Sequence, residues 1–258
     1  MSDDAARRLV LPANYPWKNL NTAVSSRDDM LPSAEHDAHY LAVGVSAAQI
    51  IHQALQLQGI VKLSSILDMP CGHGRVTRVL RATHPEADLF VCDLDRDGVA
   101  FCAQQFSATP LVSIPDFRKL DFGRQFDLIW VGSLITHLPE SVTVDFIDFA
   151  LRHLTPRGVA VVSSHGPFVV GRMQMNILNG GEGYGTENGA ARVMLRDYFD
   201  KGYGYADYPN NDNSVQHYGI SLTAPEWLKA AVVSVGGKVL LYRDHAFDRH
   251  HDIVAFAH

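Results

Sequence analysis

The chain has 258 residues, of which 47% are hydrophobic and 19% are charged. A chain of this size and composition can bury a core and has room for one α/β domain with an insertion, which excludes a disordered protein and two large domains. The formal net charge is −6, and no run of lysine and arginine is present. Because binding along a phosphate backbone needs clustered basic residues, we expect no nucleic-acid partner.

The cysteines and the start of the chain indicate a compartment. The three cysteines, Cys71, Cys92 and Cys102, are an odd number without CxxC spacing, which is typical of free thiols in a reducing environment. The first residues show no signal peptide. No apolar run reaches the roughly 18 residues that a membrane span requires. We therefore expect a cytoplasmic protein without a membrane partner.

The chain begins with an arm followed by a helix. Residues 1–32 contain Pro12, Pro16 and Pro32 among polar residues, which predicts an irregular arm. From about Ser33, apolar residues recur at helical spacing until Gly59, and this pattern predicts a leading helix. The remaining residues, 33–258, are predicted to form one domain.

Strand and helix patterns then alternate. Short apolar runs predict strands, and the segments between most of them have helical length. Strands separated by helices form βαβ units, so the pattern predicts the α/β class, with a parallel sheet covered by helices on both faces. The predicted strands are 65–67, 88–92, 111–114, 126–131 and 159–163, and the predicted helices are 75–82, 97–106 and 140–154.

The alternation stops after the fifth predicted strand. Residues 166–217 are rich in Gly, Asn, Tyr and Met, with one helix expected near 190–199, and are predicted to form a folded lid or substrate-recognition segment. Thr223 to Glu226 form a capping-box pattern with Pro225 inside it, which predicts a helix to about residue 235. Residues 238–242 and 252–257 then predict an antiparallel strand pair at the end of the sheet.

The stretch around residue 70 is chemically the most informative. An apolar strand ends at Asp68, and a turn with Gly72 and Gly74 leads into a helix. These glycines carry no Cβ, which lets a ligand approach the backbone closely. A second strand ends at Asp93 about twenty residues later, where an acid accepts hydrogen bonds from the ribose of a bound nucleoside. The structural alternatives are a tight turn that needs glycine and an acid that caps the next helix, a role that Asp95 fits better.

Taken in order, these motifs resemble those of the Rossmann-like (class I) methyltransferases that use S-adenosylmethionine (SAM). The resemblance runs from about Ile66 to Ser164. It covers the glycine motif, the ribose-binding acid, a segment at 120–122 that contacts adenine, the fourth-strand motif at 126–131 and the turn at 154–159 before the fifth strand. The resemblance implies a doubly wound, mostly parallel seven-stranded sheet with a terminal antiparallel pair. It also implies SAM as the cofactor, bound by Asp68, Pro70, Gly72, Gly74, Arg75, Asp93, Leu94, Asp121, Phe122 and Gly132.

One departure from the family pattern leaves an alternative open. Pro70 stands where the family motif usually has its first glycine, and proline fixes φ and removes a hydrogen-bond donor. The alternative is a nucleotide-dependent oxidoreductase, whose G-x-G-x-x-G motif would need a glycine where this sequence has Thr77. SAM has no pyrophosphate for that glycine to accommodate, which favours SAM. A non-catalytic SAM-binding regulatory protein is the second alternative, because methyl transfer needs no diagnostic nucleophile.

Three histidines are candidates for catalysis. The enzyme must align the acceptor with the methyl group, and a hydroxyl acceptor also benefits from a general base, whereas a neutral amine needs little help. His137 follows the fourth predicted strand, His165 ends the fifth and has Gly166 beside it, and His217 closes the insertion. Each is a candidate base, and packing of the loop over the cofactor is the alternative role for His137.

The insertion is predicted to bind the acceptor. Tyr184, Tyr203, Tyr205 and Tyr208 would form an aromatic, hydrogen-bonding wall for a small polar molecule, for instance a sugar or a related metabolite. Tyr203, Tyr205 and Tyr218 are the residues predicted to bind it. The alternative roles of the tyrosines are a contact between two copies of the chain in a homodimer and a cover over the exposed edge of the core. His245, His250, His251 and Asp252 have the side chains of metal ligands, but their spacing matches no standard site. They are predicted to form a polar loop, and no metal is expected.

Overall fold

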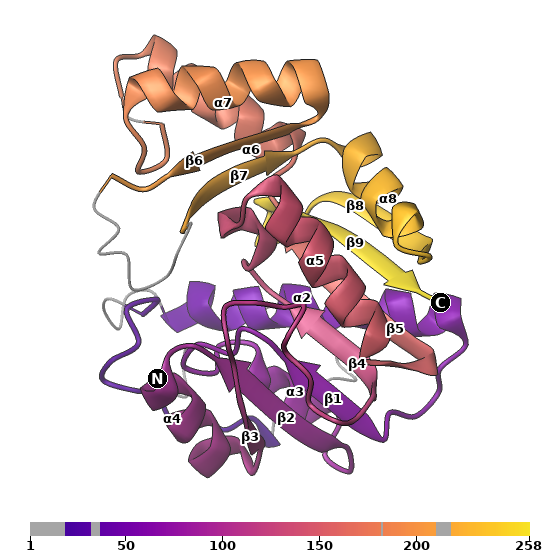
Figure 1. Cartoon of the computed structure of the whole chain (residues 1–258). Helices are drawn as coiled ribbons and strands as arrows, with labels where there is room; N and C mark the ends of the chain where they lie inside the picture. The colour runs from indigo at the N-terminus through magenta and orange to yellow at the C-terminus, as the bar shows by residue number, and fades with distance from the viewer. Residues whose placement is uncertain (1–18, 32–36, 182, 210–217) are drawn as a thin grey trace.

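The computed structural model describes residues 19–31, 37–181, 183–209 and 218–258. None of the helices in these ranges is long and apolar enough to cross a membrane. In chain order (Figure 1) the elements are α2 (Asp37–Gln58), β1 (Ser65–Asp68), α3 (Thr77–Thr83), β2 (Asp88–Asp93), α4 (Arg96–Phe106), β3 (Thr109–Val112), β4 (Phe126–Val131), the 3₁₀ helix η3 (Ile135–His137), α5 (Glu140–Arg152), β5 (Leu154–Ser164), α6 (Pro167–Leu178), α7 (Asn188–Lys201), β6 (Tyr203–Asp207), β7 (Gly219–Thr223), α8 (Pro225–Ser234), β8 (Lys238–Phe247) and β9 (His251–Ala257).

The main sheet has seven strands in the order β3-β2-β1-β4-β5-β9-β8. The first five run parallel, and β9 runs antiparallel to both of its neighbours. This topology confirms the predicted fold class. Asp68, the last residue of β1, pairs with Val91 on one side and Trp130 on the other, so the carboxyl ends of β1, β2 and β4 meet at one edge. Open α/β sheets bind ligands at this edge.

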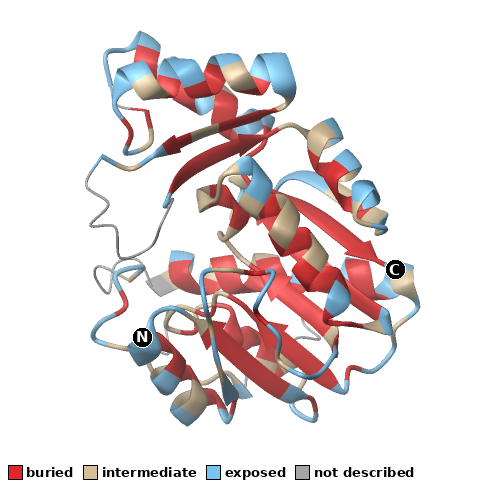
Figure 2. Ribbon diagram, viewed as in Figure 1, coloured by how far each residue is buried: buried red, intermediate tan, exposed pale blue. Residues whose placement is uncertain are grey.

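Helices bury both faces of the sheet. Neighbouring strand residues point to opposite faces, and Ile66 packs with side chains of α2, α3 and α4, whereas Leu67 packs with those of α5 and α8. As a result, the inner strands are buried along almost their whole length, while the helices expose their outer sides (Figure 2). The continuous apolar strands in the sequence are a direct consequence of this two-sided burial.

The insertion after β5 has a hydrophobic core of its own. It contains α6, α7 and the antiparallel pair β6–β7, and its buried residues include Val170, Met173, Met194 and Leu222. In Figure 1 these elements lie above the main sheet, on the side of its carboxyl edge. The inserted structure runs on through β7 to Thr223, beyond the predicted boundary at residue 217, and the sequence patterns did not reveal α6 and β6.

Two local predictions were wrong. The third strand ends at Val112, so Ser113 and Ile114 belong to the loop that follows it. Thr223 does not cap α8, because it is the last residue of β7 and the cap position falls on Ala224, which has no side-chain hydrogen bond. The Thr223 hydroxyl is buried without a hydrogen-bond partner among the described residues. Pairing with β6 therefore takes precedence over the local capping pattern.

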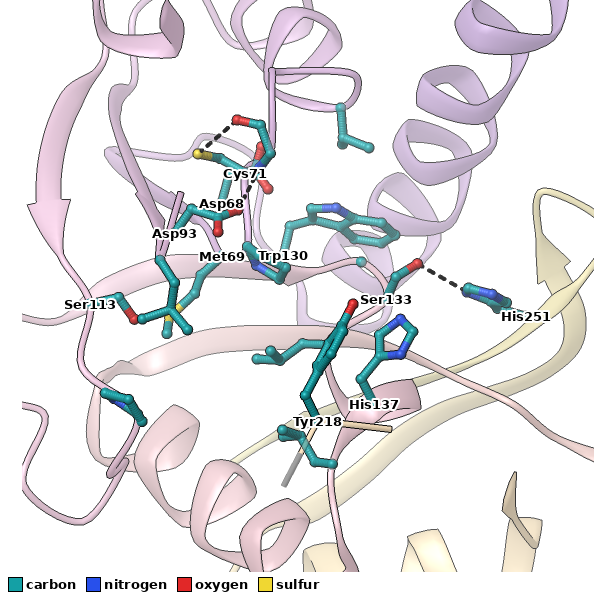
Figure 3. A pocket seen from close by; sticks show the side chains of 18 of the residues that line it. Asp68, Met69, Cys71, Asp93, Ser113, Trp130, Ser133, His137, Tyr218 and His251 are labelled. Atoms are coloured by element: carbon teal, nitrogen blue, oxygen red, sulfur yellow. Dashed lines mark hydrogen bonds between the residues drawn. The ribbon is translucent and has the colours of Figure 1, made fainter. Parts of the chain in front are cut away.

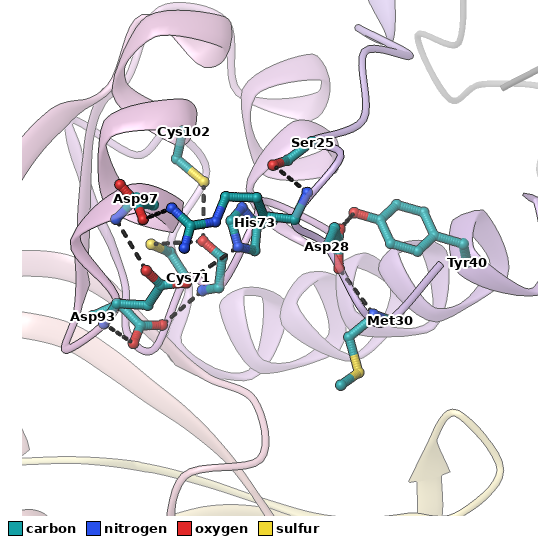
Figure 4. A network of polar contacts seen from close by, with 12 residues as sticks. Ser25, Asp28, Met30, Tyr40, Cys71, His73, Asp93, Asp97 and Cys102 are labelled. Carbon is teal, nitrogen blue, oxygen red and sulfur yellow. Dashed lines mark hydrogen bonds and ion pairs between the residues drawn. The ribbon is translucent and has the colours of Figure 1, made fainter. Parts of the chain in front are cut away.

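A buried arginine ties the described part of the arm, residues 19–31, to the domain. Arg78 in α3 is 1% exposed, and its Nη1 donates to the Ala23 carbonyl at 2.8 Å while its Nε donates to the Gly74 carbonyl at 3.0 Å. Its Nη2 donates to the Tyr40 hydroxyl at 3.2 Å. That hydroxyl in turn donates to Asp28 at 2.6 Å (Figure 4). The arm, the glycine turn and α2 are thus linked through one side chain.

Replacing Arg78 with methionine is expected to lower the free energy of unfolding by about 3 kcal/mol. Methionine keeps the length of the side chain but leaves the buried carbonyls without their donors, and hydrogen bonds from a charged donor in the interior contribute on this scale. Urea unfolding followed by circular dichroism would measure the change. The matched control is Arg96→Met at the exposed start of α4, for which a change within about 0.5 kcal/mol is expected. Equal effects of the two substitutions would contradict the structural role of Arg78.

Candidate functional site

A cavity of about 1260 Å³ lies at the carboxyl edge of the sheet. Its walls come from the ends of β1, β2 and β4, the loop after β3, the insertion and the turn between β8 and β9 (Figure 3). Sites for a single small molecule usually measure roughly 300–1,000 Å³. The cavity is therefore large enough for two ligands side by side.

The two glycines of the turn after β1 have different roles. Gly72 has φ +48°, and a Cβ added there would meet nothing within 4 Å. It lines the cavity and leaves its backbone accessible. Gly74 has φ +84°, but an added Cβ would overlap the ring of Phe106 in α4. Contrary to the prediction, Gly74 is not part of the cavity wall, and its lack of a side chain allows the turn to pack against α4.

Asp68 lines the cavity and has one buried carboxylate oxygen without a partner among the described residues. The side chain is 1% exposed, and its Oδ2 accepts a hydrogen bond from the Thr77 hydroxyl at 2.6 Å. Its Oδ1 has no hydrogen-bond partner among the described residues. Burial raises the pKa of this carboxyl to about 7, with the neighbouring charge of Asp93 adding to the effect. Buried polar atoms rarely stay unpaired, so this oxygen suits a ligand that brings a donor or a positive charge.

Asp93 at the end of β2 is fixed by backbone donors. The Gly72 amide donates to its Oδ2 at 2.8 Å, and the Asp95 amide donates to its Oδ1 at 3.0 Å (Figure 4). Asp95, not Asp93, caps α4 by accepting from the Asp97 amide. Asp93 lines the cavity, and its oxygens retain lone pairs for ligand hydroxyls. The acid expected to bind ribose and the acid expected to cap the helix are thus separate residues.

The segment predicted to contact adenine lies elsewhere. Asp121 and Phe122 precede β4, at the opposite edge of the sheet, where the Phe122 ring packs against Phe149 and its backbone amide donates to His153. Neither lines the cavity. Since β3 ends at Val112, its carboxyl end brings residues 113–118 to the cavity instead. The Pro-Asp pair within this loop is the only local signal of a turn there.

Most of the other residues predicted to bind the cofactor do reach the cavity. Pro70 and Arg75 line it from the turn after β1, Leu94 from the end of β2, and Gly132 from the end of β4. Asp28 and Met30 of the arm also line the cavity. The sequence had predicted no functional role for either residue.

His137 and His165 line the cavity at its insertion side, whereas His217 lies outside the described residues. The Nδ1 atom of His137 is 2.8 Å from the Gly219 carbonyl, and that of His165 is 3.2 Å from the Ser221 carbonyl. Burial lowers the pKa of His137, and it lowers that of His165 to about 3, so both rings are neutral at pH 7. Each Nδ1 then carries the proton donated to its carbonyl, which leaves Nε2 with the lone pair.

Gly166 was expected to leave open space beside His165, but the structure shows that this space is filled. A Cβ at Gly166 would overlap the carboxylate of Asp252, so the glycine accommodates this buried acid and leaves no room for a ligand there. Asp252 also accepts from the Tyr242 hydroxyl and from the His245 amide. It belongs to the framework of β8 and β9.

The insertion contributes tyrosines to the cavity, but only one of the three that were predicted to bind the acceptor. Tyr218 lines it, with its ring 5.1 Å from that of His137 (Figure 3). Tyr203 in β6 is buried and donates to the Leu138 carbonyl, and Tyr205 donates to Asp207. Alternate residues of a strand share a face, and this face of β6 does not line the cavity. The aromatic wall is formed by Tyr218 together with Tyr184 and Tyr208, both of which the sequence predicted for it.

Comparisons with known proteins agree on the fold. Residues 66–158 match the family model of a methyltransferase domain. A SAM-dependent methyltransferase from Clostridium acetobutylicum ATCC 824 has a TM-score of 0.55 at 14% identity, covering 81% of this chain and 89% of its own. The 1,6-didemethyltoxoflavin-N1-methyltransferase of Burkholderia thailandensis, crystallised with its substrate and S-adenosylhomocysteine, has a TM-score of 0.55 at 14% identity, covering 84% of this chain and 78% of its own. No curated protein matches the chain in sequence.

A third similar structure is a SAM-bound amino pentose methyltransferase from Micromonospora echinaspora, with a TM-score of 0.55 at 14% identity and coverage of 83% of this chain and 91% of its own. Likeness at such low identity establishes the fold. The match to the methyltransferase-domain model covers the strands that form the cavity edge, from β1 to the start of β5. The chain therefore contains a methyltransferase domain over residues 66–158, and its strand order and cavity edge are those of the class I SAM-dependent methyltransferase fold.

Proposed function

We propose that the enzyme methylates a hydroxyl or amine of a small polar acceptor, such as a sugar or a related metabolite. The observation that carries the proposal is the division of the cavity into two ends. Acids and a glycine turn form one end, and the tyrosines and histidines of the insertion side form the other. A single cavity with both ends has room to bring a cofactor and an acceptor together.

The acid end has the groups that SAM would need. Asp93 would accept hydrogen bonds from the ribose hydroxyls, the loop 113–118 would contact the adenine, and the unpaired oxygen of Asp68 would face positive charge of the cofactor. Gly72 leaves the backbone open to it. SAM supplies a methyl group that its sulfonium has already activated, so the protein's task is to bind, to orient and to exclude water.

The aromatic end is suited to a polar ring. The rings of Tyr208 and Tyr218 lie 5.4 Å apart and the ring of His137 lies within about 6 Å of both. Flat rings with polar edges contact the faces of sugars and heterocycles while their hydroxyls form hydrogen bonds. The toxoflavin-precursor and amino pentose methyltransferases that share the fold act on small molecules of these kinds. The cytoplasmic location and the homodimer remain predictions.

The experiment that tests this function is a calorimetric titration with SAM, S-adenosylhomocysteine and NAD. Micromolar binding of both SAM species, about −8 kcal/mol, is expected, with no binding of NAD. Asp93→Ala is expected to weaken SAM binding at least tenfold, because it removes the ribose acceptor and the anchor of the Gly72 amide. The matched control is Asp97→Ala on the exposed start of α4, which should not change the affinity. Binding of NAD without SAM would instead support the oxidoreductase alternative.

His137 is the proposed proton acceptor for a hydroxyl substrate. Its pKa is lowered by burial, so the ring is neutral at pH 7, and Nε2 is free when Nδ1 donates to Gly219. His137→Ala is expected to lower kcat by about 10²- to 10⁴-fold for a hydroxyl acceptor, with SAM affinity unchanged. The measurement is formation of S-adenosylhomocysteine with the acceptor found by screening sugars and hydroxylated metabolites. An unchanged kcat would show that the acceptor is an amine or that another base acts.

A further inference from the structure

Three histidines from distant parts of the sequence converge at the aromatic end of the cavity. His165 follows β5, and His250 and His251 come from the turn between β8 and β9 and the start of β9. One side-chain nitrogen of each lies within 4.8 Å of the others. All three residues line the cavity. In Figure 3, His251 lies beside Ser133 at the carboxyl end of β4.

Neighbouring groups orient two of the three rings. His165 has its Nδ1 at 3.2 Å from the Ser221 carbonyl, and His251 has its Nδ1 at 3.3 Å from the Ser163 hydroxyl. With Nδ1 as the donor in each case, the Nε2 atoms carry the lone pairs. Histidines that bind metals are held in a similar way, with the second ring nitrogen donating to a backbone carbonyl, a carboxylate or water.

In the part of the chain that the structure describes, no carboxylate forms an ion pair with any of the three imidazoles, and Asp248, two residues from His250, pairs with His39 instead. The adjacent Asp252 is engaged by the Tyr242 hydroxyl and the His245 amide. The ring of His137 lies 6.4 Å from that of His165 and has its own carbonyl partner. Three imidazole nitrogens that converge, with no proton donor shared among them in the described residues, suit a cation.

We propose that His165, His250 and His251 bind one divalent transition-metal ion at the acceptor end of the cavity. Imidazole ligands suit Zn²⁺ and its neighbours Co²⁺, Ni²⁺ and Fe²⁺, whereas Mg²⁺ and Ca²⁺ require oxygen ligands. Metal–nitrogen bonds of about 2.1 Å require the nitrogens to approach somewhat more closely than their present limit of 4.8 Å. The partly buried ring of His250 has the freedom to make this adjustment.

Three protein ligands leave a coordination position open, as in catalytic zinc sites. Because the three histidines line the cavity, the open position faces the space assigned to the acceptor. There the ion would bind an oxygen of the acceptor and orient it. This role rests on the proposed function, whereas the metal site itself does not.

The test is titration of the chelator-treated full chain with Co²⁺, followed by visible absorption. One equivalent is expected to bind and to give the absorption bands of a four- or five-coordinate nitrogen site, which Zn²⁺ then abolishes by displacement. His250→Ala is expected to weaken Co²⁺ binding by about 100-fold or more and to remove the bands. The matched control is His245→Ala, an exposed histidine in β8, which should bind Co²⁺ like the wild type.

Equal Co²⁺ affinity of the wild type and His250→Ala, or the absence of the bands, would overturn the proposal. SAM titration of both variants, followed by calorimetry, is run in parallel. SAM binding retained by His250→Ala would show that the variant is folded and that a loss of Co²⁺ binding reports the metal site. Failure of the wild type to bind SAM would count against the proposed function and leave the Co²⁺ result to decide the metal site.

Discussion

Gly74→Ala is expected to destabilise the protein by about 3 kcal/mol and to weaken SAM binding. The residue has φ +84°, which costs a side chain roughly 1 kcal/mol, and its Cβ would overlap the Phe106 ring and touch Cys102. Overpacking of such a contact typically costs about 1–3 kcal/mol more. To relieve this overlap the turn must move away from α4. This movement displaces the Gly72 amide from Asp93. Urea unfolding and SAM calorimetry measure the two effects.

Substitutions at two other glycines separate the backbone cost of Gly74→Ala from its packing cost and from its effect on SAM binding. Gly123 has φ +63° with nothing near an added Cβ, so Gly123→Ala should show the backbone cost alone, about 1 kcal/mol, with SAM binding unchanged. Gly72→Ala has a similar backbone cost, but its Cβ would project into the cavity, so the loss should fall mainly on SAM affinity. If Gly74→Ala were no more destabilising than Gly123→Ala, the packing explanation would be wrong.

The sequence predicted the fold well because its signals are local. Each inner strand is a short apolar run ended by a turn, and each helix between strands carries apolar residues at helical spacing. Two-sided burial of a parallel sheet imposes both patterns. The positions of Asp68, Gly72 and Asp93 at the cavity follow from the same rule, since each stands at the carboxyl end of a strand.

The parts that could not be predicted depend on contacts between distant residues. Asp121 was placed at the cavity because it lay about where the adenine segment was expected, but the sequence did not show that β3 ends early enough for residues 113–118 to form that wall. Tyr203 and Tyr205 face away because β6 pairs with β7 in one particular register. The meeting of His165 with His250 and His251 requires β9 to lie antiparallel beside β5, with Ser164 opposite Asp252.

Asp68 links stability to pH in the opposite direction from most acids. Its pKa is about 7 in the folded protein, against about 3.9 in an unfolded chain. The folded state therefore binds more protons than the unfolded state between these values. The stability associated with the protonated form is fully present below about pH 4 and is lost as pH rises through 7, by up to about 4 kcal/mol. At alkaline pH the protein thus holds a buried carboxylate at a cost that the Thr77 hydrogen bond offsets in part and that a ligand with a donor or a positive charge would offset further.

Asp68→Asn is consequently expected to make the ligand-free protein more stable at pH 8, by about 2–4 kcal/mol, and nearly unchanged at pH 5. The same substitution should weaken SAM binding at pH 8 at least tenfold, whereas SAM binding by the wild type should strengthen from pH 5 to pH 8 as Asp68 ionises. Urea unfolding and calorimetry at the two pH values measure these changes, with Asp88→Asn at the exposed start of β2 as the control. A less stable Asp68→Asn protein at pH 8 would show that the buried carboxylate is compensated within the fold itself. Opposite changes in stability and affinity would show instead that this acid is kept for its ligand.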